Sequence, residues 1–198
     1  LLMRLYDPDA GAVYVGGRNV KSYPKEELNR KFGAVFQNDF LMAASVRGNI
    51  DFERGLSDEQ IARAAEYAQA SGFIGEHGGM DAELTARGSN FSGGQKQRLL
   101  IARALAASPE ILVLDDSSSA LDYKTDARLR KTLFENMPET TVVLIAQRIS
   151  SVRFADHILV LDGGRMVGFG TDAELMQRCE EYRRIYDSQH GEGGEEDA

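Results

Sequence analysis

One stretch of this sequence decides the fold, and it reads Phe91-Ser92-Gly93-Gly94-Gln95-Lys96-Gln97-Arg98. A Ser-Gly-Gly turn stands here at the start of a helical pattern, and its two glycines let the backbone approach a bound group closely. Unpaired N–H groups and the helix dipole attract negative charge at such a position. The octet therefore predicts an anion site for phosphate, whereas Ser-Gly-Gly alone would indicate only a serine cap on an ordinary helix.

Three short apolar runs follow the octet and predict a sheet. They lie at residues 111–114, 142–145 and 158–161, and their continuous rather than alternating hydrophobicity is typical of strands covered on both faces. A helical pattern at 123–136 separates the first two runs. Strands that alternate with helices predict an α/β fold with a parallel sheet.

The segment from residue 38 to about residue 107 has a different pattern. Helical periodicity marks residues 58–71 and 95–107, and the glycine-rich residues 72–79 are typical of a linker. We therefore expect a helical insert between a strand at 32–36 and the later strands.

The two ends of the sequence carry further predictions. Residues 1–6 have the pattern of the end of an amphipathic helix, and Pro8 and Gly11 then predict a turn. A last helix is expected at 172–188, and residues 189–198, rich in glycine and acidic side chains, predict a disordered tail.

The composition excludes several classes of function. The formal net charge is −8, from 23 basic and 31 acidic residues, and the absence of a basic stripe argues against a nucleic-acid partner. Cys179 is the only cysteine, so no internal disulfide is possible and a reducing compartment is expected. No apolar run approaches the roughly 20 residues that a membrane-spanning helix needs. The length of 198 residues suits a single domain.

The octet matches the signature motif of the ABC ATPase family almost letter for letter, and the sequence resembles that family from Leu1 to about Ser188. The resemblance implies a P-loop NTPase-like ABC ATPase core with a parallel sheet plus a helical subdomain at about 38–107. It also implies that ATP and Mg²⁺ are the cofactors. The signature residues that would contact the nucleotide are Ser92, Gly93, Gly94 and Gln95.

Further family motifs follow in the expected order. Asp115 and Asp116 end an apolar strand at the carboxyl edge of the sheet, where ligands of parallel sheets bind. They resemble the Walker B element, in which Asp115 would hold Mg²⁺. Gln37 resembles the Q-loop glutamine, which reaches the metal and senses the transmembrane partner. Asp122 ends a segment that resembles the D-loop, which in the family crosses the dimer interface toward the opposite nucleotide site, so the resemblance implies that Asp122 takes part in nucleotide binding. Taken alone, the acidic residues would indicate turns or helix caps, and Gln37 would indicate a loop.

Two positions depart from the family pattern. Asp116 stands where the family has a catalytic glutamate, and its shorter side chain would have to reach farther for the attacking water. Gln147 stands where the family has its switch histidine, and an amide cannot carry the imidazolium charge. We therefore expect this catalytic site to bind ATP but to hydrolyse it slowly. The alternative is that both substitutions are tolerated in an active enzyme.

A Walker A loop is missing from the sequence. Residues 11–18 have its glycine spacing, but they lack the final Lys and Ser or Thr and open a strand where the loop requires a helix. In the family, a helix and then an Asp-Pro-x-x-Gly turn follow the Walker A loop, and residues 1–11 resemble the end of that helix and the turn. The resemblance thus implies an ABC ATPase domain at 1–188 that lacks Walker A, with the loop and a fused transmembrane domain upstream.

The resemblance also defines an expected function. Residues 45–50 and 85–88 resemble the exporter branch of the family, which implies ATP-driven export from the cytoplasmic face of a membrane, with the plasma membrane as the expected one. In ABC dimers the signature of one subunit closes over the Walker motifs of the other. An intact signature in a chain with a weakened site therefore predicts a heterodimer with a second ABC subunit, and this fragment alone would be inactive. The alternatives are a non-catalytic regulatory ABC module and a soluble ABC ATPase that acts on DNA or ribosomes.

Overall fold

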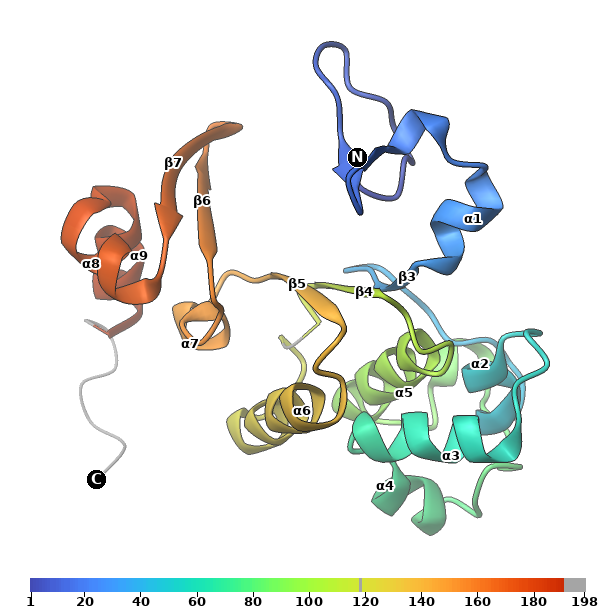
Figure 1. Cartoon of the computed structure of the whole chain (residues 1–198). Helices are drawn as coiled ribbons and strands as arrows, with labels where there is room; N and C mark the ends of the chain where they lie inside the picture. The colour runs from blue at the N-terminus through green and yellow to red at the C-terminus, as the bar shows by residue number, and fades with distance from the viewer. Residues whose placement is uncertain (118, 191–198) are drawn as a thin grey trace. The chain divides into compact units, whose positions relative to one another are not determined.

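The computed structural model describes residues 1–117 and 119–190, and most of the expected acidic tail, residues 191–198, lies outside this part. The chain divides into two compact units, Leu1–Ile145 and Ala146–Ala198. Figure 1 follows the chain from its blue N-terminal end through the strands and helices of the first unit to the orange elements of the second.

A three-stranded parallel sheet organises the first unit. Its strands are β3 (Phe32–Val35), β4 (Ile111–Asp115) and β5 (Thr141–Ile145), in the order β3-β4-β5. Val35 pairs with Leu114, so β3 and β4 end side by side at the same edge. The prediction of an α/β fold with a parallel sheet is confirmed, and β3 ends one residue earlier than expected.

Strand β5 is less covered than its sequence predicts. Val142 and Ile145 are 38% and 47% exposed, and among the described residues β5 pairs only with β4. The expectation that this apolar run is covered on both faces is therefore wrong. The physical reason is that a continuous apolar run shows only that a strand could be buried on both faces. Whether the strand is buried depends on the elements that pack against it.

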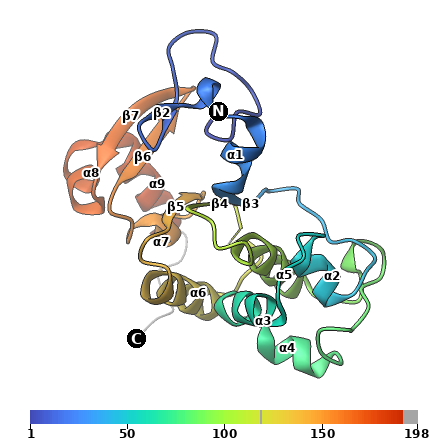
Figure 2. The same ribbon diagram turned by 45° about the vertical axis from the view of Figure 1, so that its right-hand side comes forward.

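Four helices form the insert between β3 and β4, and they gather beside one another in both ribbon views (Figures 1 and 2). They are α2 (Val46–Asp51), α3 (Asp58–Tyr67), α4 (Ser71–Glu76) and α5 (Gly93–Leu105). Helix α5 supplies the fully buried Leu99 and Ile101, which share one hydrophobic core with Leu112 and Leu114 of β4. After β4, helix α6 (Tyr123–Asn136) has the predicted bounds.

The glycine-rich segment 72–79 is not simply the linker that its composition suggested. Its first half belongs to α4, because Phe73 and Ile74 are buried in the core of the unit. Tertiary packing of two large side chains thus outweighs the poor helix propensity of glycine at Gly72 and Gly75.

The N-terminal residues form a small hairpin rather than a phosphate loop. Strands β1 (Tyr14–Val15) and β2 (Arg18–Asn19) pair in antiparallel fashion. Gly16 and Gly17 turn between them with φ of 56° and 73°, a conformation that favours glycine. The glycine spacing at 11–18 therefore belongs to a hairpin and not to a Walker A loop, which its lack of Lys and Ser or Thr had already argued against.

The expectation of a helix end at residues 1–6 is wrong. The Arg4 N–H donates to the Leu1 carbonyl oxygen at 2.9 Å, which closes a turn. Arg4 also has a φ of 52°, outside the helical region. A left-handed residue at this position cannot continue a regular helix.

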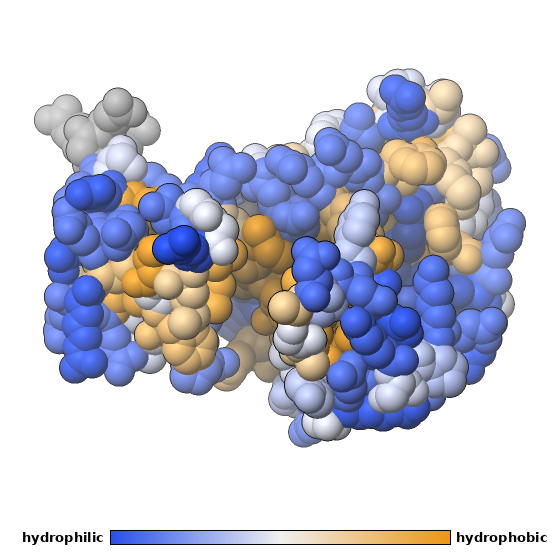
Figure 3. All heavy atoms as spheres, turned by 90° about the horizontal axis from the view of Figure 1, so that it is seen from above, coloured by the Kyte–Doolittle hydropathy of each residue, from blue (hydrophilic) through white to orange (hydrophobic). Residues whose placement is uncertain are grey.

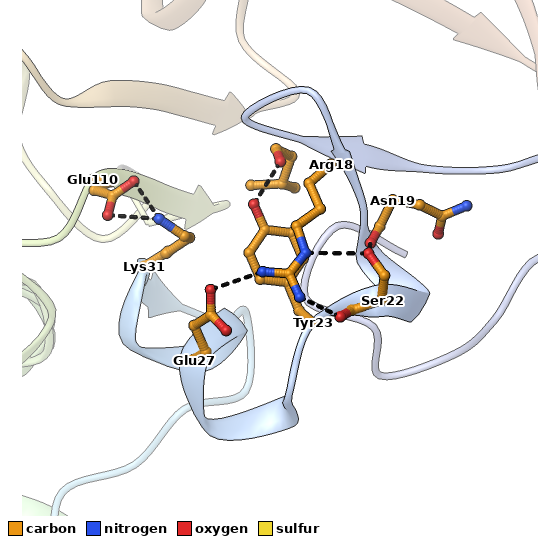
Figure 4. Close-up of polar contacts among 8 residues, drawn as sticks. Arg18, Asn19, Ser22, Tyr23, Glu27, Lys31 and Glu110 are labelled. Atoms are coloured by element: carbon orange, nitrogen blue, oxygen red, sulfur yellow. Dashed lines mark hydrogen bonds and ion pairs between the residues drawn. The ribbon is translucent and has the colours of Figure 1, made fainter.

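Polar contacts tie this hairpin to the elements that follow it, the short turn η1 (Val20–Ser22) and helix α1 (Lys25–Arg30). In Figure 4 the Arg18 guanidinium lies over the ring of Tyr23, 4.2 Å from its centroid, and donates to Glu27 at 3.1 Å. Lys31 donates to both carboxylate oxygens of Glu110 at 2.8 Å, next to the start of β4. These contacts fix the segment that leads into β3.

Up to residue 190, the second unit combines a hairpin with three helices. Its elements are α7 (Ile149–Val152), β6 (Ile158–Asp162), β7 (Arg165–Gly170), α8 (Asp172–Arg178) and α9 (Glu180–His190). The single last helix expected at 172–188 is broken at Cys179, whose backbone is extended (φ −111°, ψ 112°). The boundary of the tail is also wrong, because Gln189 belongs to α9 and its side chain is hydrogen-bonded.

The hairpin of β6 and β7 buries only one of its faces. Ile158 and Val160 pack with Leu175 and Tyr182 of the two last helices. Large apolar side chains of the hairpin remain exposed at the surface. Figure 3 shows that the molecular surface carries several such hydrophobic areas, coloured orange, among hydrophilic ones. The exposed large apolar residues of the hairpin are Leu159, Leu161, Met166, Val167 and Phe169. No helix in the described part of the chain is both long and apolar enough to cross a bilayer.

Candidate functional site

The signature turn forms a well-defined helix start. Ser92 is the N-cap of α5: its Oγ accepts the Gln95 N–H at 3.3 Å, and its own N–H donates to Gln95 Oε1 at 2.8 Å. This reciprocal arrangement is a capping box. The first backbone N–H groups of the helix, at Gly93 and Gly94, have no partner within the helix. The turn thus presents N–H donors at a positive helix end, and binding of an anion there remains a prediction.

The segment that resembles the D-loop, at residues 119–122, lies close to this turn. A Cβ atom on Gly94 would come within 3.1 Å of the Ala120 carbonyl oxygen and 3.8 Å of Leu121 Cδ2, so a larger residue would fit there only with a small shift of the neighbouring backbone. Asp122 caps α6 by accepting from Thr125 Oγ1 at 2.7 Å and from the Thr125 N–H at 2.9 Å. These hydrogen bonds, the side-chain one first, lower the pKa of Asp122. The structure therefore gives Asp122 a capping role, and its part in nucleotide binding remains a prediction.

An aromatic cluster that no sequence motif indicated packs around Phe91, the residue before the signature turn. Phe91 is buried and stacks on the ring of His77 at a centroid distance of 4.4 Å. Phe73 meets Phe91 edge-on at 6.0 Å, and the Arg98 guanidinium lies 4.6 Å from the centroid of Phe73. Because Phe91 directly precedes Ser92, this packing fixes the direction in which the chain enters the turn.

The two acidic residues at the end of β4 have different backbone conformations. Asp115 ends the strand and pairs with Ile145, whereas Asp116 has a φ of 50°. The Asp116 N–H donates to the Ile145 carbonyl at 2.8 Å, and its carbonyl accepts from Ser119 Oγ at 2.9 Å. Aspartate tolerates left-handed torsions better than most residues. The turn therefore holds the Asp116 carboxylate at the edge of the sheet, where both acidic side chains are half-buried.

Gln37 lies at the same edge of the sheet. It follows β3 by two residues, and the ends of β3 and β4 are neighbours through the pairing of Val35 with Leu114. Its side chain is exposed. No hydrogen bond or ion pair from another described residue occupies the side chains of Gln37, Asp115 or Asp116. An amide oxygen and a carboxylate are ligands that suit Mg²⁺, which completes its shell with water and phosphate oxygens.

A metal cage made by the protein alone is not present: the described residues contain no cluster of three His, Cys, Asp or Glu side chains that could hold an ion.

Gln147 belongs to the second unit, whereas the other predicted site residues belong to the first. Its carbonyl oxygen accepts from Gln189 Nε2 at 2.7 Å, and Gln189 Oε1 accepts the Ile149 N–H at 2.9 Å. Helix α9 thereby fixes the backbone at Gln147, and the Gln147 side chain is exposed. Its catalytic role remains a prediction.

A solved structure identifies the class of this fold. A bacterial Atm1-family ABC exporter with ATP bound matches with a TM-score of 0.90 and 34% sequence identity, over 95% of this chain and 34% of that chain. The parallel sheet with its helical insert is therefore the fold of an ABC ATPase domain.

Sequence comparisons agree with this class. The ABC transporter family matches residues 1–119. A putative ABC transporter ATP-binding protein of Mycoplasma pneumoniae, the MG014 homolog, is 38% identical over 98% of this chain and 33% of its own length. The uncharacterized ABC transporter ATP-binding protein YknU of Bacillus subtilis is 41% identical over 96% of this chain and 33% of its own length. The chain belongs to the ABC transporter family, as an ATP-binding domain, and it spans about a third of the length of these relatives.

Proposed function

We propose that this chain is the ATP-binding part of a heterodimeric ABC exporter, in which its signature turn completes the partner's ATP site while its own site hydrolyses ATP slowly. One observation carries this proposal: a single chain combines an intact signature turn at Ser92 with two altered catalytic positions, Asp116 and Gln147. A homodimer would place both alterations in each of its sites. A different partner subunit is therefore the arrangement that keeps one site competent.

The signature turn has the donors that a bound phosphate requires. One lone pair of Ser92 Oγ accepts the Gln95 N–H, which leaves the hydroxyl proton to donate outward. The N–H groups of Gly93 and Gly94 add two further donors at the positive end of α5. A γ-phosphate offers only acceptors and negative charge, so it fits this set of donors.

The chain's own site has weaker catalytic groups. General-base assistance is worth about 10²- to 10⁴-fold in rate, and it depends on the base reaching the attacking water. Asp116 is one methylene shorter than the glutamate that the family uses, and Gln147 offers an amide where the family uses histidine. ATP with Mg²⁺ would still bind, with Asp115 and Gln37 as the oxygen ligands from this chain.

The remaining parts of the proposed assembly are inferred from the greater length of the relatives. Because this chain matches about a third of each relative, we place a Walker A loop and a transmembrane domain in the rest of the full-length protein. The ATP-binding domain would then work at the cytoplasmic face of a membrane, with the plasma membrane as the expected one. Export is supported by the 0.90 TM-score to the ATP-binding part of an exporter.

The test is ATP turnover of the full-length heterodimer in lipid nanodiscs. We compare the parent with Asp116→Ala in this chain, with a glutamine in place of the partner's catalytic glutamate, and with the exposed control Asp9→Ala. We expect the partner's change to abolish turnover, whereas Asp116→Ala and the control leave it within about twofold of the parent.

Two results would count against the proposal. Equal damage from Asp116→Ala and the partner's change would make this chain an ordinary hydrolytic subunit. No turnover with any glutamate-bearing partner would favour the second candidate function, a regulatory module without hydrolysis, which the same two altered positions support.

A further inference from the structure

The loop that follows Gln37 is held by a buried polar network centred on Arg103, near the end of α5. The Arg103 guanidinium donates from Nε to the Asn49 carbonyl at 2.8 Å, from Nη1 to the Phe40 carbonyl at 3.0 Å and from Nη2 to Asn49 Oδ1 at 2.9 Å. The Asp39 carboxylate lies 3.8 Å from Nη1. Each nitrogen of the planar fork therefore has its own acceptor.

Asn49 extends this network to the far end of the loop. The side chain is fully buried in α2, and its Oδ1 also accepts the Met42 N–H at 2.9 Å. Its Nδ2 lies within hydrogen-bond distance of the carbonyl oxygens of Met42 (3.1 Å), Ala44 (3.3 Å) and Ser45 (3.1 Å). The amide is thus saturated, which is the condition under which a polar side chain is tolerated in a core. The loop is held at both ends of its 39–45 segment.

The Arg103 side chain is confined on its remaining sides as well. The ring of Phe52 lies 4.6 Å from the guanidinium carbon. Burial lowers the pKa of the Arg103 guanidinium, and the Asp39 carboxylate acts in the opposite direction. Arginine keeps its charge under such conditions. A buried charge with these partners permits few alternative positions of the loop.

Helix α5 connects this network to the signature turn. Ser92 caps its N-terminus, and Arg103 lies eleven residues further on, a distance of roughly 16 Å along the axis. Leu99 and Ile101 between them are fully buried, so the helix is a rigid element between its two ends. The same helix therefore carries the signature at one end and holds the Gln37 loop at the other.

We propose that Arg103, supported by Asn49, is a positioning residue that makes the loop after Gln37 move together with the signature helix. The position of Gln37 in this chain's site and the position of Ser92 in the partner's site would then change together, because both are linked to α5. This inference rests on the proposed function for the role of Gln37 at Mg²⁺, whereas the mechanical link itself depends only on the contacts above.

The experiment uses the full-length heterodimer and a matched pair of substitutions. Arg103→Lys keeps the charge but loses the fork that reaches three acceptors. Arg54→Lys is the control, because Arg54 binds the carbonyl oxygens of Ile50, Asp51 and Arg103 without touching the Gln37 loop. Arg103 is half-buried and Arg54 is exposed, but both guanidiniums donate to backbone carbonyls where α2 and α5 meet, so a general loosening of that contact would appear in both variants.

The first readout is hydrogen exchange of residues 38–44, which needs no nucleotide. We expect exchange in this loop to become about tenfold faster in Arg103→Lys and to stay unchanged in Arg54→Lys. Equal exchange in both variants, or no change in either, would overturn the inference whatever the protein's function.

The second readout is the Mg²⁺ concentration that gives half-maximal binding of a fluorescent ATP analogue to this chain's site, with the partner's site disabled. We expect Arg103→Lys to raise it by about tenfold, with no effect on binding in EDTA. We expect the double variant Gln37→Ala/Arg103→Lys to lose no more than Gln37→Ala alone. Additive losses would mean that Arg103 does not act through Gln37. A Gln37→Ala variant with the Mg²⁺ dependence of the parent would refute the role of Gln37 in the proposed function. In that case the hydrogen-exchange result alone would decide whether Arg103 links the loop to the helix.

Discussion

Gly33 in the middle of β3 gives the sharpest test of the packing between the sheet and α5. A Cβ atom on Gly33 would lie 2.4 Å from the Ala104 carbonyl oxygen and 2.9 Å from Pro109 Cγ. The first neighbour is backbone in α5, so it cannot rotate away. In Gly33→Ala, β3 would have to move away from the helix, against its pairing with Leu112 of β4.

Overpacking of this kind costs about 1–3 kcal/mol, and because a backbone atom is involved we expect about 2 kcal/mol. With a urea dependence of about 2 kcal/mol per M, the unfolding midpoint should fall by about 1 M. The assay is urea unfolding followed by circular dichroism. The control is Gly72→Ala in α4, where an added Cβ meets no atom within 4 Å and alanine should stabilise the helix by up to about 1 kcal/mol. A Gly33→Ala midpoint equal to that of the parent would refute the close approach of β3 to α5.

Three further predictions concern the site and the second unit. Asp116→Glu in the full-length heterodimer should speed hydrolysis at this chain's own site by at least about tenfold, measured as phosphate release with the partner's site disabled; no increase would mean that reach is not what limits the site. The pKa of Asp122 is lowered by its hydrogen bonds from Thr125. The parent should therefore be more stable than Asp122→Ala at neutral pH, and this difference in unfolding free energy should disappear as the pH falls below about 4. The urea midpoints of the two proteins should then converge in acid. Tyr182→Phe removes the 2.8 Å hydrogen bond to Asp172 Oδ1 from a buried hydroxyl and should destabilise the chain by about 1 kcal/mol in thermal unfolding; an unchanged midpoint would contradict that contact.

The sequence was sufficient for strands β4 and β5 and for helix α6, whereas the run at 158–161 pairs antiparallel with β7 instead of joining the parallel sheet. The runs at 111–114 and 142–145 and the helix at 123–136 have strong periodicity or continuous hydrophobicity, and the structure places elements there with bounds that differ by at most one residue. The failures lie where tertiary contacts decide. Phe73 makes a helix of a glycine-rich segment, and the extended backbone of Cys179 separates α8 from α9, which packs against it.

The candidate site was predictable only as motifs. The order of Gln37, Ser92, Asp115 and Asp122 along the chain indicated the family, and the comparisons confirm the family. The support of those motifs could not be predicted, because it depends on residues distant in sequence. His77 lies beneath Phe91 only after α4 folds, and nothing in the pattern around Arg103 indicates that its side chain reaches the Phe40 carbonyl, 63 residues away.

The exposed side of β5 has a practical consequence for anyone who purifies this chain by itself. A strand edge offers a row of N–H and C=O groups to any other extended chain, and Val142 and Ile145 add apolar surface beside it. Concentrated solutions should therefore accumulate strand-paired oligomers, visible as light scattering and thioflavin fluorescence that rise with protein concentration. Dilute samples kept cold, where hydrophobic attraction is weaker, are the conditions under which monodisperse material should survive long enough for spectroscopy.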